Sequence, residues 1–242
     1  MVPRHVRHVS CVTSTDARGS LTPRVDVSPN LYRRLVLAAL FPIACPGCGA
    51  LGAPVCRACE VLLRPAPDAP APPGLDAWAS PFAYAGVARE VVARAKYRNV
   101  RAVVPWLAAS MCDALRRVEP SPALVTWAPT TDRRRRDRGF DLAELLGRAV
   151  ARRLRVPCRT MVRRAPGPPQ TGLGASDRRV GPRFAPAARA SAAWTAEGAV
   201  VLVDDVATTG ATLAAAAFAL RTADVTRVVG LTAARTPPPG YR

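Results

Sequence analysis

Short apolar runs alternate with longer helix-forming segments along most of this chain. Val200 to Val203 are four consecutive apolar residues, mostly β-branched and too few for a buried helix, and they predict a parallel strand covered on both faces. Strands are expected at residues 78–85, 123–128, 200–203 and 225–232, and helices at 87–96, 102–118, 141–154 and 213–220. This alternation predicts an α/β fold in which helices flank a parallel sheet.

The predicted strand at 200–203 ends at two adjacent carboxylates, Asp204 and Asp205. A loop of small and hydroxyl-bearing residues follows, and a helix then begins; the loop consists of Ala207, Thr208, Thr209, Gly210, Ala211 and Thr212. Such a junction leaves free backbone N–H groups and the positive end of a helix dipole directed at one point. The threonine hydroxyls add donors, and the glycine allows close approach. This threonine loop, residues 207–212, is therefore predicted to bind an anion.

The two carboxylates do not suit the same anion, because like charges a few ångströms apart repel. They suit a neighbouring group that offers hydroxyl donors or a cation. A ribose 5-phosphate fits both halves, with its diol on Asp204 and Asp205 and its phosphate in the threonine loop. The alternative is a buried strand with an Asp-rich turn and a hydroxyl-capped helix. The chain contains no Gly-x-x-x-x-Gly-Lys-Ser/Thr loop and no Gly-x-Gly-x-x-Gly after a predicted strand, which excludes two other phosphate-binding motifs.

The formal net charge of +18 at pH 7 implies a polyanionic partner, either a phosphorylated metabolite or a nucleic acid, and composition does not choose between them. Lys96 is the only lysine in an arginine-rich chain, which suggests that a compact ammonium is wanted there, with chance as the alternative. The only histidines are His5 and His8. Histidine-dependent triads, Cys-His nucleophiles and histidine-ligated metals are therefore excluded from the body of the chain.

Two Cys-x-x-Cys pairs, separated by seven residues, lie ahead of the predicted sheet; they are Cys45, Cys48, Cys56 and Cys59. Four thiolates at this spacing predict a closed tetrahedral Zn²⁺ site, which is structural because no coordination position is left for a substrate. A redox pair and disulfides are the weaker alternatives. A redox pair would need only one Cys-x-x-Cys, and disulfides would need an oxidising compartment. Cys11, Cys112 and Cys158 are scattered and are interpreted as incidental.

These patterns divide the chain into five segments. Residues 1–30 are polar without apolar periodicity and are predicted to be a disordered extension. Residues 31–63 are the zinc-binding module, whose apolar run from Leu31 to Ala44 is expected to be a short helix against the cysteines rather than a signal peptide or membrane span. A Pro-rich linker at 64–77, an α/β domain at 78–235 and a tail at 236–242 follow. No membrane insertion and a cytoplasmic location are expected.

An arginine-rich loop is expected after the strand at 123–128, with arginines at every position from Arg133 to Arg136. Ligands of such sheets bind at the carboxyl ends of the strands, so this loop and the threonine loop are predicted to face one crevice. The cations would then lie where a pyrophosphate binds, opposite the ribose phosphate. Arg138, beside Gly139, is the preferred ligand, and a solvated loop is the alternative interpretation.

Several motifs in order resemble one known family. The stretch from Val200 to Thr212 resembles the 5-phosphoribosyl-1-pyrophosphate (PRPP) binding motif of the type I phosphoribosyltransferases. Together with the cysteine pairs, Lys96-Tyr97-Arg98, Arg138-Gly139-Phe140 and Gln170-x-x-Leu173 followed by Arg178, it makes residues 40 to 235 similar to the ComF family. ComF proteins are phosphoribosyltransferase-like and are associated with DNA uptake in competent bacteria.

The resemblance implies a type I phosphoribosyltransferase fold that binds PRPP with Mg²⁺ and transfers the phosphoribosyl group to an unknown nitrogen acceptor. It implies that Asp204 and Asp205 are the catalytic acids. The implied PRPP contacts are Ala207, Thr208, Thr209, Gly210, Ala211, Thr212, Arg138, Lys96, Arg164 and Arg178. The segment from Arg163 to Arg179 would be a mobile loop that closes over PRPP, or else an unstructured connection.

The chain departs from the family pattern at two places. Ala128-Pro129-Thr130-Thr131 stands where family members commonly read Val-Pro-x-His, so the histidine is missing. Asp141 replaces an asparagine, where its charge would either bind Mg²⁺ or weaken anion binding. The alternative function is a non-catalytic PRPP- or nucleotide-sensing protein, or a DNA-associated competence factor that contacts single-stranded DNA or competence-machinery proteins. The low aromatic content of 5% counts against a stacking platform for single strands.

Overall fold

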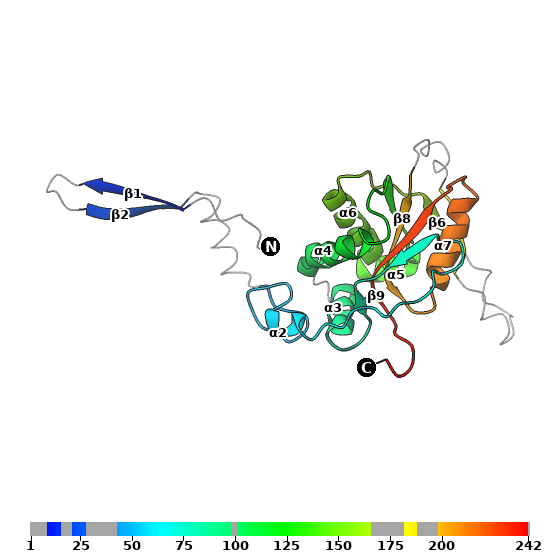
Figure 1. Cartoon of the computed structure of the whole chain (residues 1–242), viewed down its shortest axis with the longest axis horizontal. Coiled ribbons are helices and arrows are strands. Elements are labelled where there is room, and N and C mark those ends of the chain that lie inside the picture. Colours follow the sequence, from blue (N-terminus) through cyan, green and yellow to red (C-terminus); the bar gives the residue numbers. More distant parts are fainter. Residues whose placement is uncertain are drawn as a thin grey trace.

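The structure is a computed structural model that describes residues 9–15, 21–27, 43–97, 101–165, 182–187 and 198–241, the first two segments as backbone only. Its centre is a five-stranded parallel sheet in the order β3-β9-β8-β5, with β4 also paired to β9 (Figure 1). The strands are β3 Ala77–Ala79, β4 Phe82–Ala83, β5 Leu124–Trp127, β8 Val200–Ala207 and β9 Val228–Arg235. This sheet confirms the predicted α/β class.

Helices cover both faces of the sheet. They are α3 Gly86–Tyr97, α4 Val104–Leu115, α6 Leu142–Leu154 and α7 Ala211–Arg221. The described part of the chain also contains α2 Arg57–Glu60, the 3₁₀ turn Arg101–Val103 and α5 Asp132–Arg138. Residues of α3, α4 and α6 pack with Val201 and Val203 in one core, whereas α7 packs with Val200 and Leu202 in a second core. Burial of β8 on both faces explains why its sequence is continuously apolar instead of alternating.

Several local predictions differ from the structure. The strand expected at 78–85 is split into β3 and β4, and the helix expected at 102–118 begins as a 3₁₀ turn and ends at Leu115. β8 continues through both acids to Ala207, because Asp204, Val206 and Ala207 keep their pairing with β9. The arginine-rich loop is helix α5 instead: Thr131 Oγ1 accepts a hydrogen bond from the N–H of Arg134 and caps its start, and Gly139, at φ 74°, ends it.

Two antiparallel hairpins accompany the central sheet. Within residues 1–30, which were predicted to be a disordered extension, β1 Val9–Thr15 pairs with β2 Leu21–Val27. β6 Val162–Arg164 pairs with β7 Phe184–Pro186 and packs near α7. The apolar run predicted as a helix at 31–44 lies almost entirely outside the described residues, as does most of the predicted closing loop.

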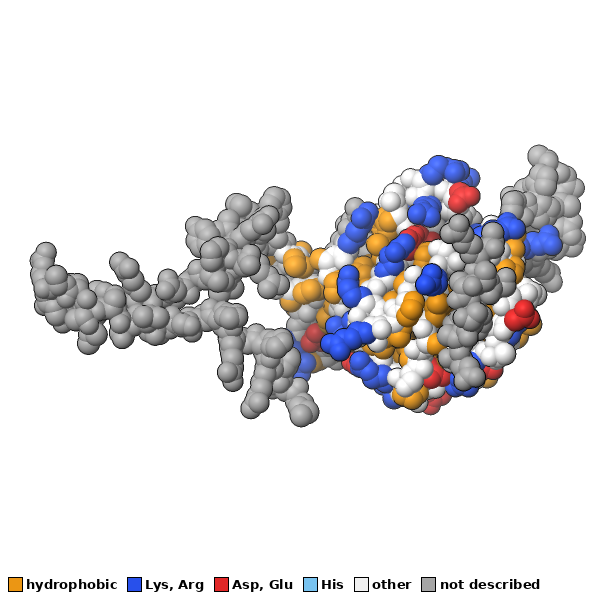
Figure 2. Space-filling view, turned by 90° about the horizontal axis from the view of Figure 1, so that it is seen from above, with side chains coloured by type: hydrophobic (Ala, Val, Ile, Leu, Met, Phe, Trp, Pro, Cys, Tyr) orange, Lys and Arg blue, Asp and Glu red, His pale blue; other side chains and the backbone are white. Residues whose placement is uncertain are grey.

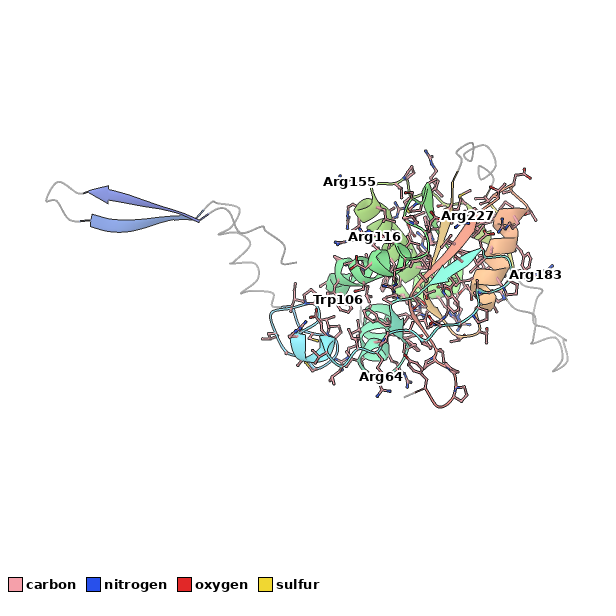
Figure 3. All side chains as sticks on the ribbon, viewed as in Figure 1. Arg64, Trp106, Arg116, Arg155, Arg183 and Arg227 are labelled. Atoms are coloured by element: carbon pink, nitrogen blue, oxygen red, sulfur yellow. The ribbon has the colours of Figure 1, made fainter. Side chains whose placement is uncertain are left out.

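The cysteine-rich module packs on the α/β domain rather than standing apart from it. Cys45, Cys59 and Val55 belong to the same core as α3 and α4. Trp106, labelled on α4 in Figure 3, donates a hydrogen bond from Nε1 to Glu60 Oε1 of α2 at 3.0 Å, and its indole stacks on Phe82. The module is thereby fixed against α4 by both apolar and polar contacts. No helix in the described part of the chain is long and apolar enough to cross a membrane.

The segment predicted as a linker, 64–77, also lies against the domain. Pro72 is buried next to Gly210, and Gly74 lies against Ala217 of α7. The Arg221 guanidinium donates to the carbonyl oxygen of Gly74 and pairs with Asp76 at 2.7 Å. Residues 72–76 therefore form a strap across the start and the end of α7, and this strap is named below by that range.

Leu220→Ala should lower the free energy of unfolding by about 2 to 5 kcal/mol, because Leu220 is fully buried between α7 and the sheet and its truncation leaves a cavity. Phe218→Ala on the same helix is the matched control. Phe218 is 55% exposed, so its loss should cost less than about 1 kcal/mol. Equilibrium unfolding in guanidinium chloride measures both, and equal losses would contradict the assignment of the α7 core face.

Candidate functional site

A hollow lies where β8 passes into α7. It holds about 220 Å³, counting the space open to solvent at its mouth. Its lining consists of Asp204, Val206, Leu213 and the whole threonine loop, residues 207–212. The hollow is at the carboxyl end of a central parallel strand, the usual ligand position in α/β sheets. One of the two predicted acids and all the predicted loop residues are thus brought together around a single small space.

The conformation of the threonine loop depends on Gly210. Its φ of 75° is in the left-handed region, where residues with a side chain are strained. A Cβ atom at this position would also lie 2.6 Å from the Cγ of Pro72, so the strap leaves no room for one. Pro72 had no signal in the sequence beyond a proline-rich composition, because its role arises from a contact between distant parts of the chain that only the fold creates.

The loop presents donors rather than acceptors to the hollow. Gly210 precedes the first residue of α7, and the N–H groups of the first helical turn have no acceptor within the helix. The N–H of Ala211 has only a long bond, 3.4 Å, to Thr209 Oγ1. Together with the positive end of the α7 dipole, these groups make the loop suitable for a phosphate or another small anion.

Asp204 and Asp205 have different surroundings. Successive side chains of a strand point to opposite faces of the sheet, and only Asp204 is among the residues that line the hollow. Asp205 is 8% exposed and accepts a hydrogen bond from Lys96 Nζ at 2.8 Å. Lys96 lies near the end of α3, so this ion pair joins α3 to β8. Lys96 therefore contacts a predicted catalytic acid rather than the hollow itself.

The pKa values of these groups reflect their burial and mutual charge. Burial, and next the negative charge of Asp205, raise the pKa of Asp204 well above its ordinary value. Burial acts to lower the pKa of Lys96, but the charge of Asp205 and the hydrogen bond to it outweigh burial, so the pKa is raised. A carboxyl whose pKa is raised by burial and a neighbouring charge is a common feature of functional sites.

Asp141, one of the departures from the family pattern, has a structural role here. It is the N-cap of α6: its Oδ1 accepts from the N–H groups of Ala143 and Glu144, and its Oδ2 accepts from the N–H of Thr130 at 2.8 Å. Burial raises the pKa of Asp141 even though these hydrogen bonds oppose the effect. The carboxylate is thus occupied by backbone donors that join the end of β5 to α6.

The arginines expected around a pyrophosphate come from different elements, with Arg138 in α5 and Arg164 in β6. Arg138 lies with its guanidinium 4.6 Å from the ring centre of Tyr97, and Arg164 of β6 lies over Phe184. Burial and then the charge of Arg134 lower the pKa of Arg164, although Asp204 and Asp141 oppose this effect. Arg178 lies outside the described residues. Lys and Arg side chains recur over the face shown in Figure 2, with acidic side chains between some of them.

The four cysteine sulfurs form a second candidate site. The Sγ atoms of Cys45, Cys48, Cys56 and Cys59 all lie within 4.8 Å of one another. Gly47 makes this possible, because a Cβ atom there would lie 2.6 Å from Cys59 Sγ. Burial acts to raise the pKa of Cys45, but backbone N–H groups of Cys56, Cys48 and Gly47 bond its sulfur and lower the pKa to about 6. The cluster can bind a metal ion such as zinc, with thiolate ligands at the usual spacing.

Comparisons with known proteins do not identify a family for this chain. No family model matches the chain, and no curated protein matches it either. The crystal structure of the protein TT1426 from Thermus thermophilus is similar over 57% of this chain and 85% of its own, at 16% sequence identity and a TM-score of 0.29. A likeness of that TM-score carries no argument about function, so the resemblance to the ComF family stays a prediction.

Asp204→Asn should raise the melting temperature of the ligand-free protein at pH 7. Because the pKa of Asp204 is raised by folding, its contribution to stability is complete below the ordinary pKa of 3.8 and is lost as pH rises through the higher folded value. Asparagine removes this loss and keeps an Oδ1 acceptor for the N–H of Asp205.

Melting curves between about pH 4 and pH 8 test this, since the variant should show a smaller decline with rising pH than the unaltered protein. Asp224→Asn is the matched control, because Asp224 is exposed and lies beyond the far end of α7 from the loop. A lower melting temperature of Asp204→Asn at pH 7 would show that the charged carboxylate supports the fold.

Proposed function

We propose that this protein binds PRPP through the threonine loop and acts as a phosphoribosyltransferase on a nitrogen acceptor. The observation that supports it most is the hollow between β8 and α7, where a donor-rich loop and a carboxyl line the same small space. A sugar phosphate has both of the required chemistries, an anion for the loop and hydroxyl donors for the carboxyl. The ordered motifs that resemble the type I phosphoribosyltransferases and the ComF family favour the same assignment.

In this proposal the 5-phosphate accepts hydrogen bonds from the first-turn N–H groups of α7 and from the hydroxyls of Thr208, Thr209 and Thr212. Asp204 accepts from the ribose hydroxyls. Asp205 contributes through its ion pair with Lys96, which sets the charge next to Asp204 and holds β8 against α3. Asp204 is therefore the acid that contacts the ligand. Asp205 lies on the opposite face of the strand, where Lys96 holds it.

The transfer step needs charge stabilisation more than proton transfer. The bond from C1 of the ribose to the pyrophosphate breaks, the sugar takes up oxocarbenium-like positive charge, and the nitrogen of the acceptor forms the new bond to C1. Arg138, Arg164 and Arg178 are proposed to stabilise the departing pyrophosphate, and Asp204 lies on the side of the developing positive charge. Histidine is dispensable for this chemistry, since positioning and electrostatics supply most of the rate.

Mg²⁺ is the implied partner of PRPP, and the carboxyl of Asp204 is an oxygen donor of the kind that this ion prefers. When bound, the ion would neutralise the charge of the pyrophosphate. Asp141 is a poor ligand for it, because both of its carboxylate oxygens already accept backbone N–H groups. Asp204, which lines the hollow, is therefore the better of these two carboxyls as a ligand for Mg²⁺.

Calorimetric titration with PRPP and Mg²⁺ tests the binding site. Asp204→Asn and Gly210→Val should each weaken binding by about tenfold or more, the first through a lost charged acceptor and the second through a displaced loop. Asp224→Asn should bind as the unaltered protein does. Equal affinity in all four proteins would show that PRPP binds elsewhere, and undetectable binding to the unaltered protein would refute the proposal.

Release of pyrophosphate with a panel of bases and amines then separates the two functional classes. Release that depends on an acceptor supports the transferase. Tight PRPP binding without release under any acceptor favours the sensing protein instead. Binding of single-stranded DNA that Asp204→Asn leaves unchanged would favour a DNA-associated factor, because the exposed arginines of α5 would then act alone.

We also propose that the four cysteines hold a structural zinc ion. Purified protein should contain about one zinc per chain by mass spectrometry, and a strong chelator should lower the melting temperature, because the sulfurs and the α2–α4 contacts belong to one core. Cys48→Ser should lose the metal. Cys158→Ser, a partly buried cysteine outside the cluster, should keep it, and folded protein without metal would contradict the assignment.

A further inference from the structure

Three buried polar atoms in one region have no hydrogen-bond partner. They are Trp78 Nε1, Thr232 Oγ1 and Arg235 Nε, and no other buried side-chain nitrogen or oxygen of the described residues is in this state. Trp78 belongs to β3, and the other two belong to the neighbouring strand β9. Buried donors are almost always paired, so three unpaired donors on adjacent strands indicate a missing acceptor.

These atoms lie close to the threonine loop. Thr232 pairs in register with Asp204, and Arg235 pairs with Ala207, the first residue of the loop. The N–H of Thr236 donates to the carbonyl oxygen of Ala207 at 2.8 Å, which fixes the end of β9 beside the loop. Figure 1 shows β8 and β9 side by side at the centre of the sheet. Thr232 and Arg235 therefore lie on the C-terminal half of β9, near the hollow but not among the residues that line it. Trp78 joins them through its contact with the Arg235 guanidinium.

Arg235 is the decisive residue of the three. The residue is only 7% exposed, and its Nε is buried and has no hydrogen-bond partner among the described residues. The guanidinium lies 4.8 Å from the ring centre of Trp78, so the indole supports one side of it. Burial lowers the pKa of Arg235 against the opposing effects of Asp68 and Tyr241. A buried cation without a directly paired counter-charge is unfavourable in a folded protein.

We propose that Arg235 and Trp78 form a second anion subsite, which takes a carboxylate or phosphate oxygen of a molecule bound beside the threonine loop. The Arg235 Nε–H and the Trp78 Nε1–H are the donors, and the charge of the guanidinium supplies most of the attraction. Thr232 of β9, which is in register with Asp204 of β8, adds a hydroxyl between this subsite and the hollow. The subsite thus extends the recognition surface from β8 to the edge of β3.

The place of this subsite in a reaction rests on the proposed function, whereas its affinity for an oxyanion does not. With PRPP in the hollow, the oxyanion comes either from the pyrophosphate of PRPP or from a carboxylate of the acceptor. Pyrophosphate and benzoate are probes that represent these two sources. Ribose 5-phosphate probes the threonine loop separately.

Calorimetry on the full chain with each probe tests the subsite. Arg235→Met should weaken binding of pyrophosphate, benzoate or both by about ten- to a hundredfold, because a charged donor is lost, and should leave the affinity for ribose 5-phosphate unchanged. Arg227→Met is the matched control, since Arg227 lies at the opposite end of β9 and is already paired with Glu119. It should leave every affinity unchanged.

The melting temperature without added anion provides a second measurement. Arg235→Met should raise it, because an unpaired buried charge is replaced by an apolar side chain of similar length. A lower melting temperature together with unchanged probe affinities would show that the arginine is structural and would overturn the proposal. Should Arg235→Met fail to fold, Trp78→Phe removes only the indole donor, and unchanged affinity in that variant would also overturn it.

The two proposals fail in different ways. If ribose 5-phosphate does not bind but Arg235-dependent binding of an oxyanion persists, the proposed function is wrong and the subsite stands. If ribose 5-phosphate binds and neither probe depends on Arg235, the subsite is wrong and the threonine loop stands. Benzoate binding alone assigns the subsite to the acceptor, and pyrophosphate binding alone assigns it to PRPP.

Discussion

The parallel pairing of β8 with β5 on one side and β9 on the other is the constraint on which this structure depends. It places the carboxyl ends of three strands at one edge, and each strand brings its own polar group there. β8 brings Asp204, β5 leads to the cap Asp141, and β9 ends at Arg235. None of these groups is near another in sequence, so the site exists only because the middle strand is apolar enough to be buried on both faces.

Electrostatic balance at this edge is maintained by a few specific contacts. Asp205 would be a second charge beside Asp204, but Lys96 neutralises it from α3 at 2.8 Å. Asp141 is satisfied by backbone donors that also fix the start of α6. The single lysine of the chain therefore serves to neutralise Asp205. An arginine at this position would pair with Asp205 in a different geometry, because its guanidinium is bulkier and planar. Of these three carboxyls, Asp204 is the one that lines the hollow.

Patterns of short range predicted the fold well. The apolar run at 200–203 identified the central strand, and the cysteine spacing identified the sulfur cluster. Local rules failed where tertiary contacts decide the outcome. The acids did not end β8, because pairing with β9 continues past them, and the arginines after β5 became helix α5, because Thr131 and Gly139 cap it at both ends. Arg235 could not be identified from the sequence, because only the fold shows that its Nε is buried without a hydrogen-bond partner.

The strap at 72–76 has a further consequence for the architecture of the protein. It connects the cysteine-rich module to β3, and on the way Pro72 closes over Gly210 of the threonine loop. The module and the loop are thus mechanically linked through a few residues of extended chain. A shortened protein that began at β3 would keep every strand and helix of the α/β domain, yet it would leave the back of its threonine loop bare and unsupported.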